Sequence, residues 1–130
     1  MIVVDASALL EVLLRTPAAK VVEARLFGLG VTLHAPHLLD VEVAQVVRRF
    51  AAKGEIDAAR GRAVLDDLAD LPLHRYPHDI LLPRIWDLRA SVTAYDAAYI
   101  ALAEALNAPL VTRDQRLAVA IGHNARVEVV

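Results

Sequence analysis

The sequence contains no cysteine, which excludes disulfides, thiolate zinc sites and cysteine nucleophiles. It also lacks any uncharged stretch long enough to span a bilayer, and no basic leader precedes an apolar segment. We therefore expect a cytoplasmic protein that is neither exported nor held in a membrane.

Lysine is also scarce. Only Lys20 and Lys53 are lysines among the 14 basic residues, and the formal net charge is −2. The chain therefore has no overall basic field of the kind that marks many nucleic-acid-binding proteins. Arginine binds phosphate in a bidentate manner, so its excess suits a phosphate-bearing ligand. A GC-rich genome enriches arginine as well and is the simpler explanation.

Apolar residues make up 57% of the 130 residues, enough for the core of one domain, expected over residues 1–130. The hydrophobic pattern predicts strands at 2–4, 31–34, 72–76, 110–112 and 127–130. It predicts helices at 7–14, 18–29, 37–54, 56–71, 78–90, 93–106 and 115–121. Short aliphatic strands that alternate with helices indicate an α/β fold: a central, mostly parallel sheet of about four to five strands flanked by helices.

Two predicted strands end close to an aspartate. Asp5 directly follows Ile2-Val3-Val4, and Asp114 lies two residues beyond Thr112. Each aspartate alone is explained as the N-cap of the next helix. Parallel sheets, however, bind ligands outside the carboxyl ends of their strands, so both side chains are expected at the same edge.

Two further acids lie on predicted helices. Asp96 follows the N-cap candidate Thr93 by three residues, and there the positive end of the helix dipole is expected to lower its pKa. Glu42 lies among Leu38, Leu39 and Val46, and an isolated glutamate on such a face is costly.

Four carboxylates that converge on one pocket repel each other unless a cation lies between them. The four are Asp5, Glu42, Asp96 and Asp114. All-oxygen ligands favour Mg²⁺ or Mn²⁺. The sequence therefore predicts a divalent-metal site, and the ion would neutralise Asp5.

These stretches resemble the PIN-domain ribonucleases, and within them the VapC-type toxins of bacterial type II toxin–antitoxin systems. The resemblance is carried in order by IVVDASALL, PHLLDVEVAQVVRR, TAYDAAYIALAEAL and LVTRDQRLA, and it covers essentially the whole chain. It implies a magnesium- or manganese-dependent endoribonuclease that hydrolyses RNA phosphodiester bonds.

The resemblance also implies roles for individual residues. Asp5, Glu42, Asp96 and Asp114 would be catalytic; the three aspartates would bind the metal directly, and Glu42 would hold water at the ion or a second ion. Ser7 and Thr112 match small hydroxyl positions that help to order the acids.

The sequence suggests only candidates for the residues that contact RNA. Arg113 and Arg116 flank Asp114 and are candidates for phosphate binding, with a solvated surface as the equal alternative; Arg89 is a weaker candidate. Bases would stack on aromatic side chains. The candidates are Tyr95, Tyr99 and Trp86, of which the last two are expected in the core.

The resemblance implies a homodimer and a cognate VapB-type antitoxin whose C-terminal segment covers the active-site groove. The apolar segments DASALLEVLL and VVEARLFGL suit such a groove, and equally suit plain core packing.

Two other classes remain as alternatives. A phospho-acceptor receiver-like domain requires paired acids after the first strand and a lysine near a late strand. Here Ala6 follows Asp5, and no lysine lies beyond Lys53. A non-catalytic α/β binding module would keep the fold and need none of the acids.

Overall fold

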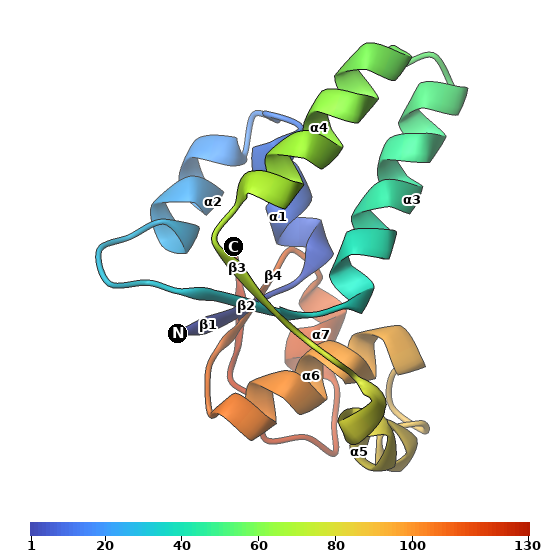
Figure 1. Cartoon of the computed structure of the whole chain (residues 1–130). Helices are drawn as coiled ribbons and strands as arrows, with labels where there is room; N and C mark the ends of the chain where they lie inside the picture. The colour runs from blue at the N-terminus through green and yellow to red at the C-terminus, as the bar shows by residue number, and fades with distance from the viewer.

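The computed structural model describes residues 1–130 as a five-stranded sheet with helices on both sides (Figure 1). The strands are β1 (Ile2–Val4), β2 (Leu33–Pro36), β3 (Leu73–Tyr76), β4 (Leu110–Thr112) and β5 (Val127–Val129). The helices are α1 (Ala6–Leu13), α2 (Ala19–Leu26), α3 (Leu38–Ala52), α4 (Ala58–Asp70), α5 (Leu82–Asp87), α6 (Ala94–Leu106) and α7 (Gln115–Val119). The order of strands is β3-β2-β1-β4-β5 and all pairings are parallel, which confirms the predicted fold class.

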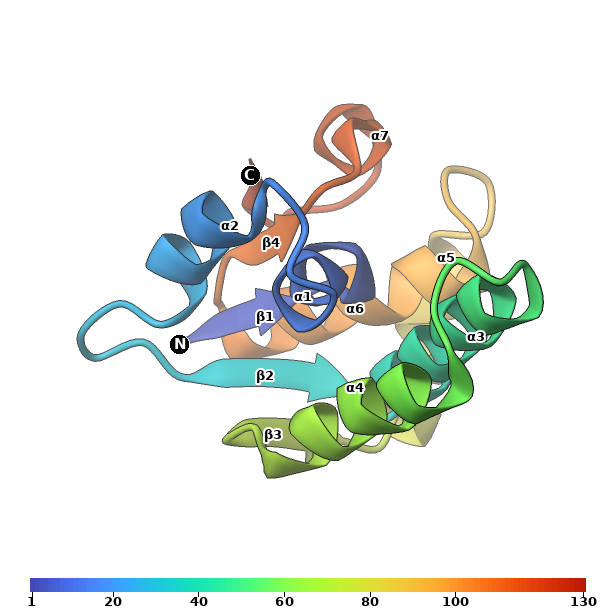
Figure 2. The same cartoon turned by 90° about the horizontal axis from the view of Figure 1, so that it is seen from above.

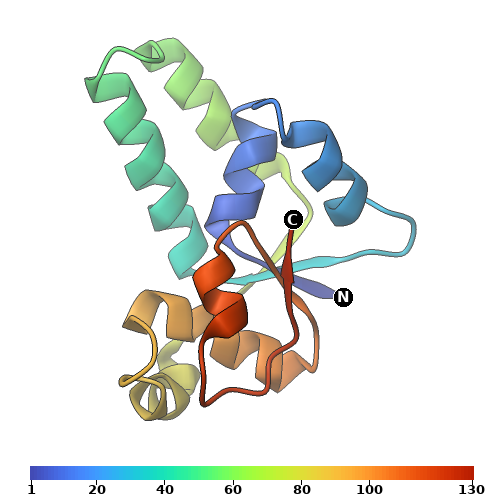
Figure 3. The same cartoon turned by 180° about the vertical axis from the view of Figure 1, so that it is seen from behind.

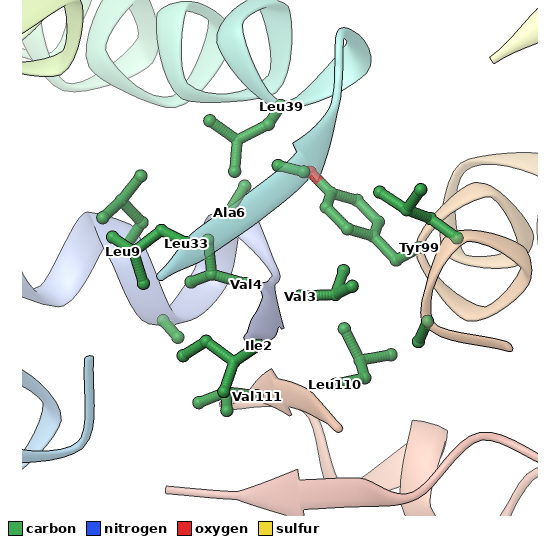
Figure 4. Close-up of a cluster of buried hydrophobic side chains, with 14 of the residues drawn as sticks. Ile2, Val3, Val4, Ala6, Leu9, Leu33, Leu39, Tyr99, Leu110 and Val111 are labelled. Carbon is green, nitrogen blue, oxygen red and sulfur yellow. The ribbon is translucent and has the colours of Figure 1, made fainter. Parts of the chain in front are cut away.

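Central strand β1 lies at the middle of the core. Its side chains are buried on both faces, as expected for a parallel sheet between helical layers. Helices α1 to α4 lie on one side of the sheet, and α5 and α6 lie on the other (Figure 1). Figure 4 shows Tyr99 of α6, Val3 of β1 and Leu9 of α1 in one cluster of buried side chains. Helices α3 and α4 pack against each other as a hairpin that extends away from the sheet (Figures 1 and 3).

The order of strands creates a switch point at β1. From β1 the chain proceeds to β2 on one side and reaches β4 on the other only later, so the connections diverge at the carboxyl end of β1. A crevice forms at such a point in open parallel sheets. Helix α6 precedes the parallel strand β4 and packs across β1 and β2, so its N-terminus comes to this edge (Figure 2).

Several predicted boundaries were wrong. Strand β2 begins at Leu33 rather than Val31, because its ladder with β1 starts with the pair Ile2 and Leu33. Helix α2 ends at Leu26, since the chain then turns toward Gly30, whose φ of 77° cannot continue a helix.

The single helix predicted over 78–90 is also wrong. A 3₁₀ turn at Asp79–Leu81 comes first, and Pro83 lies in the first turn of α5, where its missing N–H costs no helical hydrogen bond. The chain leaves α5 at Leu88 and reaches α6 through an irregular segment. No helix in the structure has the length and apolar character that crossing a bilayer requires.

Candidate active site

The four predicted carboxylates line one cavity of about 500 Å³ at the carboxyl edge of the sheet. Asp5 follows β1, and Asp114 follows β4 after one residue. Glu42 comes from the second turn of α3 and Asp96 from the first turn of α6. Segments more than a hundred residues apart in the chain thus deliver negative side chains to one pocket. The sequence predicted this convergence, and the structure contains it.

Asp5 is buried, with 7% of its surface exposed, and its partners are hydroxyl groups. Ser7 Oγ donates a hydrogen bond of 2.8 Å to Asp5 Oδ2, and Thr112 Oγ1 donates one of 2.7 Å to the same oxygen. Although Asp5 occupies the N-cap position of α1, its side chain makes no capping hydrogen bond. The two hydroxyls therefore hold the Asp5 side chain in place, and it does not cap the helix.

Thr112 connects Asp5 to Asp114. Its hydroxyl donates to Asp5 and accepts a 3.0 Å hydrogen bond from the backbone N–H of Asp114. Ser7 Oγ similarly accepts from the backbone N–H of Arg113 at 3.0 Å. The two hydroxyls thus fix the loop after β4 against the start of α1, a positioning role that agrees with the one the resemblance implies.

Glu42 is half-buried, and Tyr99 Oη donates a 2.5 Å hydrogen bond to its Oε1. Burial raises the pKa of Glu42, the hydrogen bond from Tyr99 opposes that shift, and the charges of Asp5 and Asp96 add to it. Tyr99 is fully buried, as predicted. Its hydroxyl is the partner that the apolar surroundings of Glu42 required, and no local pattern in the sequence identifies it.

Asp96 is partly buried and its backbone N–H donates to Thr93 Oγ1 at 3.2 Å, so Thr93 caps α6 as predicted. The expected lowering of its pKa was wrong. Desolvation raises the pKa of Asp96, and the neighbouring charges of Asp5 and Asp114 raise it further. These effects outweigh the helix terminus, which acts mainly within one turn and is worth less than burial beside like charges.

Asp114 differs from the other acids because a cation accompanies it. It caps α7 by accepting from the backbone N–H of Arg116 at 2.9 Å. The Arg116 guanidinium also binds both of its carboxylate oxygens, and the shortest contact is 2.7 Å. The side-chain hydrogen bond from Arg116 lowers the pKa of Asp114. The pocket therefore holds acids of unequal basicity, with Glu42 and Asp96 shifted upward and Asp114 downward.

The other predicted nucleic-acid contacts lie in different places. Arg113 is turned toward the C-terminus, where its guanidinium donates to the Val130 carbonyl and lies 3.5 Å from Glu11. Tyr95 is exposed and lines the cavity. The prediction that Trp86 belongs to the core was wrong, because 66% of its surface is exposed.

The donor set suits a hard divalent cation, since every side chain that would bind it offers carboxylate oxygen. Burial is the main cause of the raised pKa values of Glu42 and Asp96, and repulsion by neighbouring carboxylates adds to it; a bound cation would relieve that repulsion. No group of three or more His, Cys, Asp or Glu side chains in the structure is arranged to hold a metal. The acids are instead directed to other partners, Asp5 to hydroxyls and Asp114 to Arg116. Metal binding would therefore require these side chains to rotate away from their present partners.

Comparison with known proteins assigns this arrangement to a family. Residues 2–122 match the family model described as PIN domain. Ribonuclease VapC9 of Mycobacterium tuberculosis is 49% identical over 117 residues, which cover 90% of this chain and 88% of that protein. Ribonuclease VapC12 of the same species is 44% identical over 130 residues, 100% of this chain and 99% of that protein. The chain therefore belongs to the PIN-domain family and, within it, to the VapC ribonucleases, as the motifs predicted.

A solved structure agrees in fold. The crystal structure of VapBC2 from Rickettsia felis, bound to a DNA fragment from its promoter, matches with a TM-score of 0.72. The match covers 99% of this chain and 98% of that chain at 16% identity. At that identity the likeness concerns the arrangement of helices and strands.

Proposed function

We propose that this protein is a magnesium- or manganese-dependent endoribonuclease, the toxin of a VapBC-type toxin–antitoxin pair, and that residues 1–130 act as one PIN domain. The observation that carries the proposal is the convergence of Asp5, Glu42, Asp96 and Asp114 on one cavity in a member of the VapC ribonucleases. A receiver-like domain is disfavoured by family membership and because Lys20 and Lys53 lie on α2 and at the end of α3, away from the late strands. A pure binding module would not need these mutually repelling acids.

Asp5, Asp96 and Asp114 would hold the divalent ion. When bound, the ion would neutralise the phosphate and lower the pKa of the attacking water. Ser7 and Thr112 would keep Asp5 oriented, because both hydroxyls donate to the same oxygen of its carboxylate. Arg116 would balance the charge of Asp114 until substrate arrives.

Glu42 is the acid best suited to move a proton. Hydrolysis requires water to attack phosphorus, the bond to the leaving oxygen to break, and one water proton to be removed. A general base works best when its pKa approaches the operating pH, and burial raises the pKa of Glu42. The hydrogen bond from Tyr99 fixes Oε1 and leaves the other carboxylate oxygen of Glu42 to accept that proton.

The partners follow from the same assignment. One wall of the cavity is apolar, with Leu10 from α1 and Leu38 and Val46 from α3. Such a wall beside an acidic pocket supports binding of an antitoxin segment that covers the active site. The substrate and the antitoxin would be met in the cytoplasm. A homodimer stays a prediction of the family resemblance.

The decisive experiment compares wild type with Asp5→Asn on RNA, after removal of metals and with Mg²⁺ or Mn²⁺ added back. Asp66→Asn is the matched control, because Asp66 is an exposed aspartate on α4. Metal-dependent cleavage by wild type and the control, lost in Asp5→Asn, supports the proposal. Equal cleavage by all three would identify a contaminant, and no cleavage by wild type would favour the binding module.

A further inference from the structure

A second hollow, of about 460 Å³, adjoins the acidic cavity. Asp96 lines both, so the two spaces are neighbours at this side chain. The second hollow is walled by the segment that joins α5 to α6, including Ser91 and Thr93, and by the start of α7. The role proposed for the acid cluster does not account for it.

Two arginines line this second hollow. Arg116 is at the border with the acidic cavity, and 84% of its side chain is exposed. Arg89 is also exposed and has no carboxylate partner. The sign of the charge thus changes beyond Asp96, from the acids that would hold a metal to cations that would hold phosphate. A nucleic-acid strand suits this arrangement, because its phosphates continue beyond the bond that is cut and are bound by arginine.

An exposed aromatic side chain extends this basic wall. The Arg89 guanidinium lies 4.6 Å from the centroid of the Trp86 ring and donates a 2.9 Å hydrogen bond to the Trp86 carbonyl. One face of the indole is therefore covered by a cation, while 66% of the residue stays exposed. An indole exposed to this degree, next to cations, is a platform on which an unpaired base stacks.

We infer that the scissile strand leaves the acidic cavity past Asp96 and crosses the second hollow, with backbone phosphates at Arg116 and Arg89 and an unpaired base on Trp86. The inference rests on the proposed function and adds a substrate class, since the stacking platform accepts single-stranded and not duplex RNA. A protein segment is the competing occupant. A helical protein partner would require an apolar groove, whereas this hollow is lined by Arg89 and Arg116. The lining therefore favours RNA as the occupant.

The test measures binding apart from cleavage. Fluorescein-labelled single-stranded RNA of about ten nucleotides is titrated in EDTA against protein that carries Asp5→Asn, so that no hydrolysis occurs. Trp86 is the only tryptophan, and its emission therefore reports on this surface alone. RNA should quench the emission in a saturable manner, and a duplex of the same sequence should not.

Further variants of the Asp5→Asn protein test the contacts of Trp86 and Arg89 with RNA separately. Trp86→Leu should weaken binding roughly fivefold or more, as expected from the loss of one stacked base, whereas Trp86→Phe should restore most of it. Arg89→Ala should lower the slope of log affinity against log salt by about 0.7, the value for one phosphate contact on a single strand. Two controls should change neither the affinity nor the salt slope: Arg62→Ala, which removes an exposed arginine on α4, and Phe27→Leu, which changes an exposed aromatic at the end of α2.

Binding seen by anisotropy without any change in tryptophan emission would overturn this path. Unchanged affinity in Trp86→Leu and Arg89→Ala would overturn it as well and would leave the hollow to a protein partner. These outcomes are distinct from failure of the proposed function. If wild type cleaves RNA with metal while the variants bind normally, only the path is wrong; if wild type does not cleave, the nuclease assignment itself fails.

Discussion

The hydroxyl of Tyr99 on α6 donates a 2.5 Å hydrogen bond to Glu42 on α3, joining the helices on opposite sides of the sheet at the acidic cavity. Burial and the nearby carboxylate raise the pKa of Tyr99, so it is a neutral donor throughout the physiological range. The bond stabilises the ionised form of Glu42 in a place where desolvation opposes it. It therefore limits the rise in the pKa of Glu42, the acid that we propose accepts a proton.

Tyr99→Phe should shift the pH dependence of RNA cleavage. Without the hydroxyl, the pKa of Glu42 rises further, and the acidic limb of the rate profile should move to higher pH. The free energy of unfolding should fall by about 1–3 kcal/mol at neutral pH, because the half-buried carboxylate of Glu42 loses its donor. Tyr95→Phe, which changes an exposed tyrosine at the same cavity, is the control for the loss of a phenol. An unshifted profile would show that Glu42 does not titrate in the rate-limiting step.

Glu42→Gln should make the metal-free protein more stable near neutral pH. Because the folded state raises the pKa of Glu42 above its ordinary 4.5, the native protein holds this proton to a higher pH than the unfolded chain does. The contribution to stability is therefore complete below the ordinary pKa and is lost as pH rises through the folded pKa. In urea unfolding with EDTA, the free energy of unfolding of the variant should rise relative to wild type from about pH 4.5 upward. The control Glu55→Gln, at an exposed position, should show no such rise. A pH-independent difference would contradict the shift.

Thr112→Val should impair both folding and cleavage. The substitution keeps the shape of a fully buried side chain but removes the donor to Asp5 and the acceptor for the backbone N–H of Asp114. A loss of about 1–3 kcal/mol in the free energy of unfolding is expected, together with weaker cleavage at saturating Mg²⁺. Thr112→Ser retains the hydroxyl and should recover the activity. If Ser and Val variants cleave equally poorly, the methyl group matters and not the hydrogen bonds.

Glu104→Gln tests an ion pair outside the site. Arg84 donates to both Glu104 oxygens at 2.9 and 3.0 Å, and these hydrogen bonds lower the pKa of Glu104. A lowered pKa contributes stability that is present above the ordinary value of 4.5 and is lost as pH falls through the folded value. The variant should lose less than about 1 kcal/mol at pH 7, since the pair is partly exposed, and the difference should vanish in acid. RNA cleavage should not change.

The sequence predicted the parts of the site that local signals specify. Asp5 and Asp114 were found because each follows an apolar strand, and Asp96 because Thr93 marks a helix start. The partners of these acids depend on the fold: Tyr99 is 57 positions from Glu42, and no periodicity links them.

Exposure is likewise decided by the tertiary structure. Trp86 resembles a core residue by type but lies on the short helix α5, which follows the 3₁₀ turn at Asp79–Leu81. On this side of the molecule α6, and not α5, packs against β1 and β2. The start of β2 differs from the prediction for a similar reason, since pairing with β1 and not local propensity decides where the strand begins.

Thermal unfolding with and without a divalent ion tests most directly whether the acids converge to bind a cation. Mg²⁺ or Mn²⁺ at a hundredfold excess over its dissociation constant should stabilise metal-free wild type by about 2.7 kcal/mol, seen as a rise in Tm. Asp66→Asn should show the same rise, and Asp5→Asn and Asp96→Asn should lose most of it. If wild type does not respond, or if Asp5→Asn and Asp96→Asn respond as wild type does, no ion binds among these carboxylates and the account is wrong.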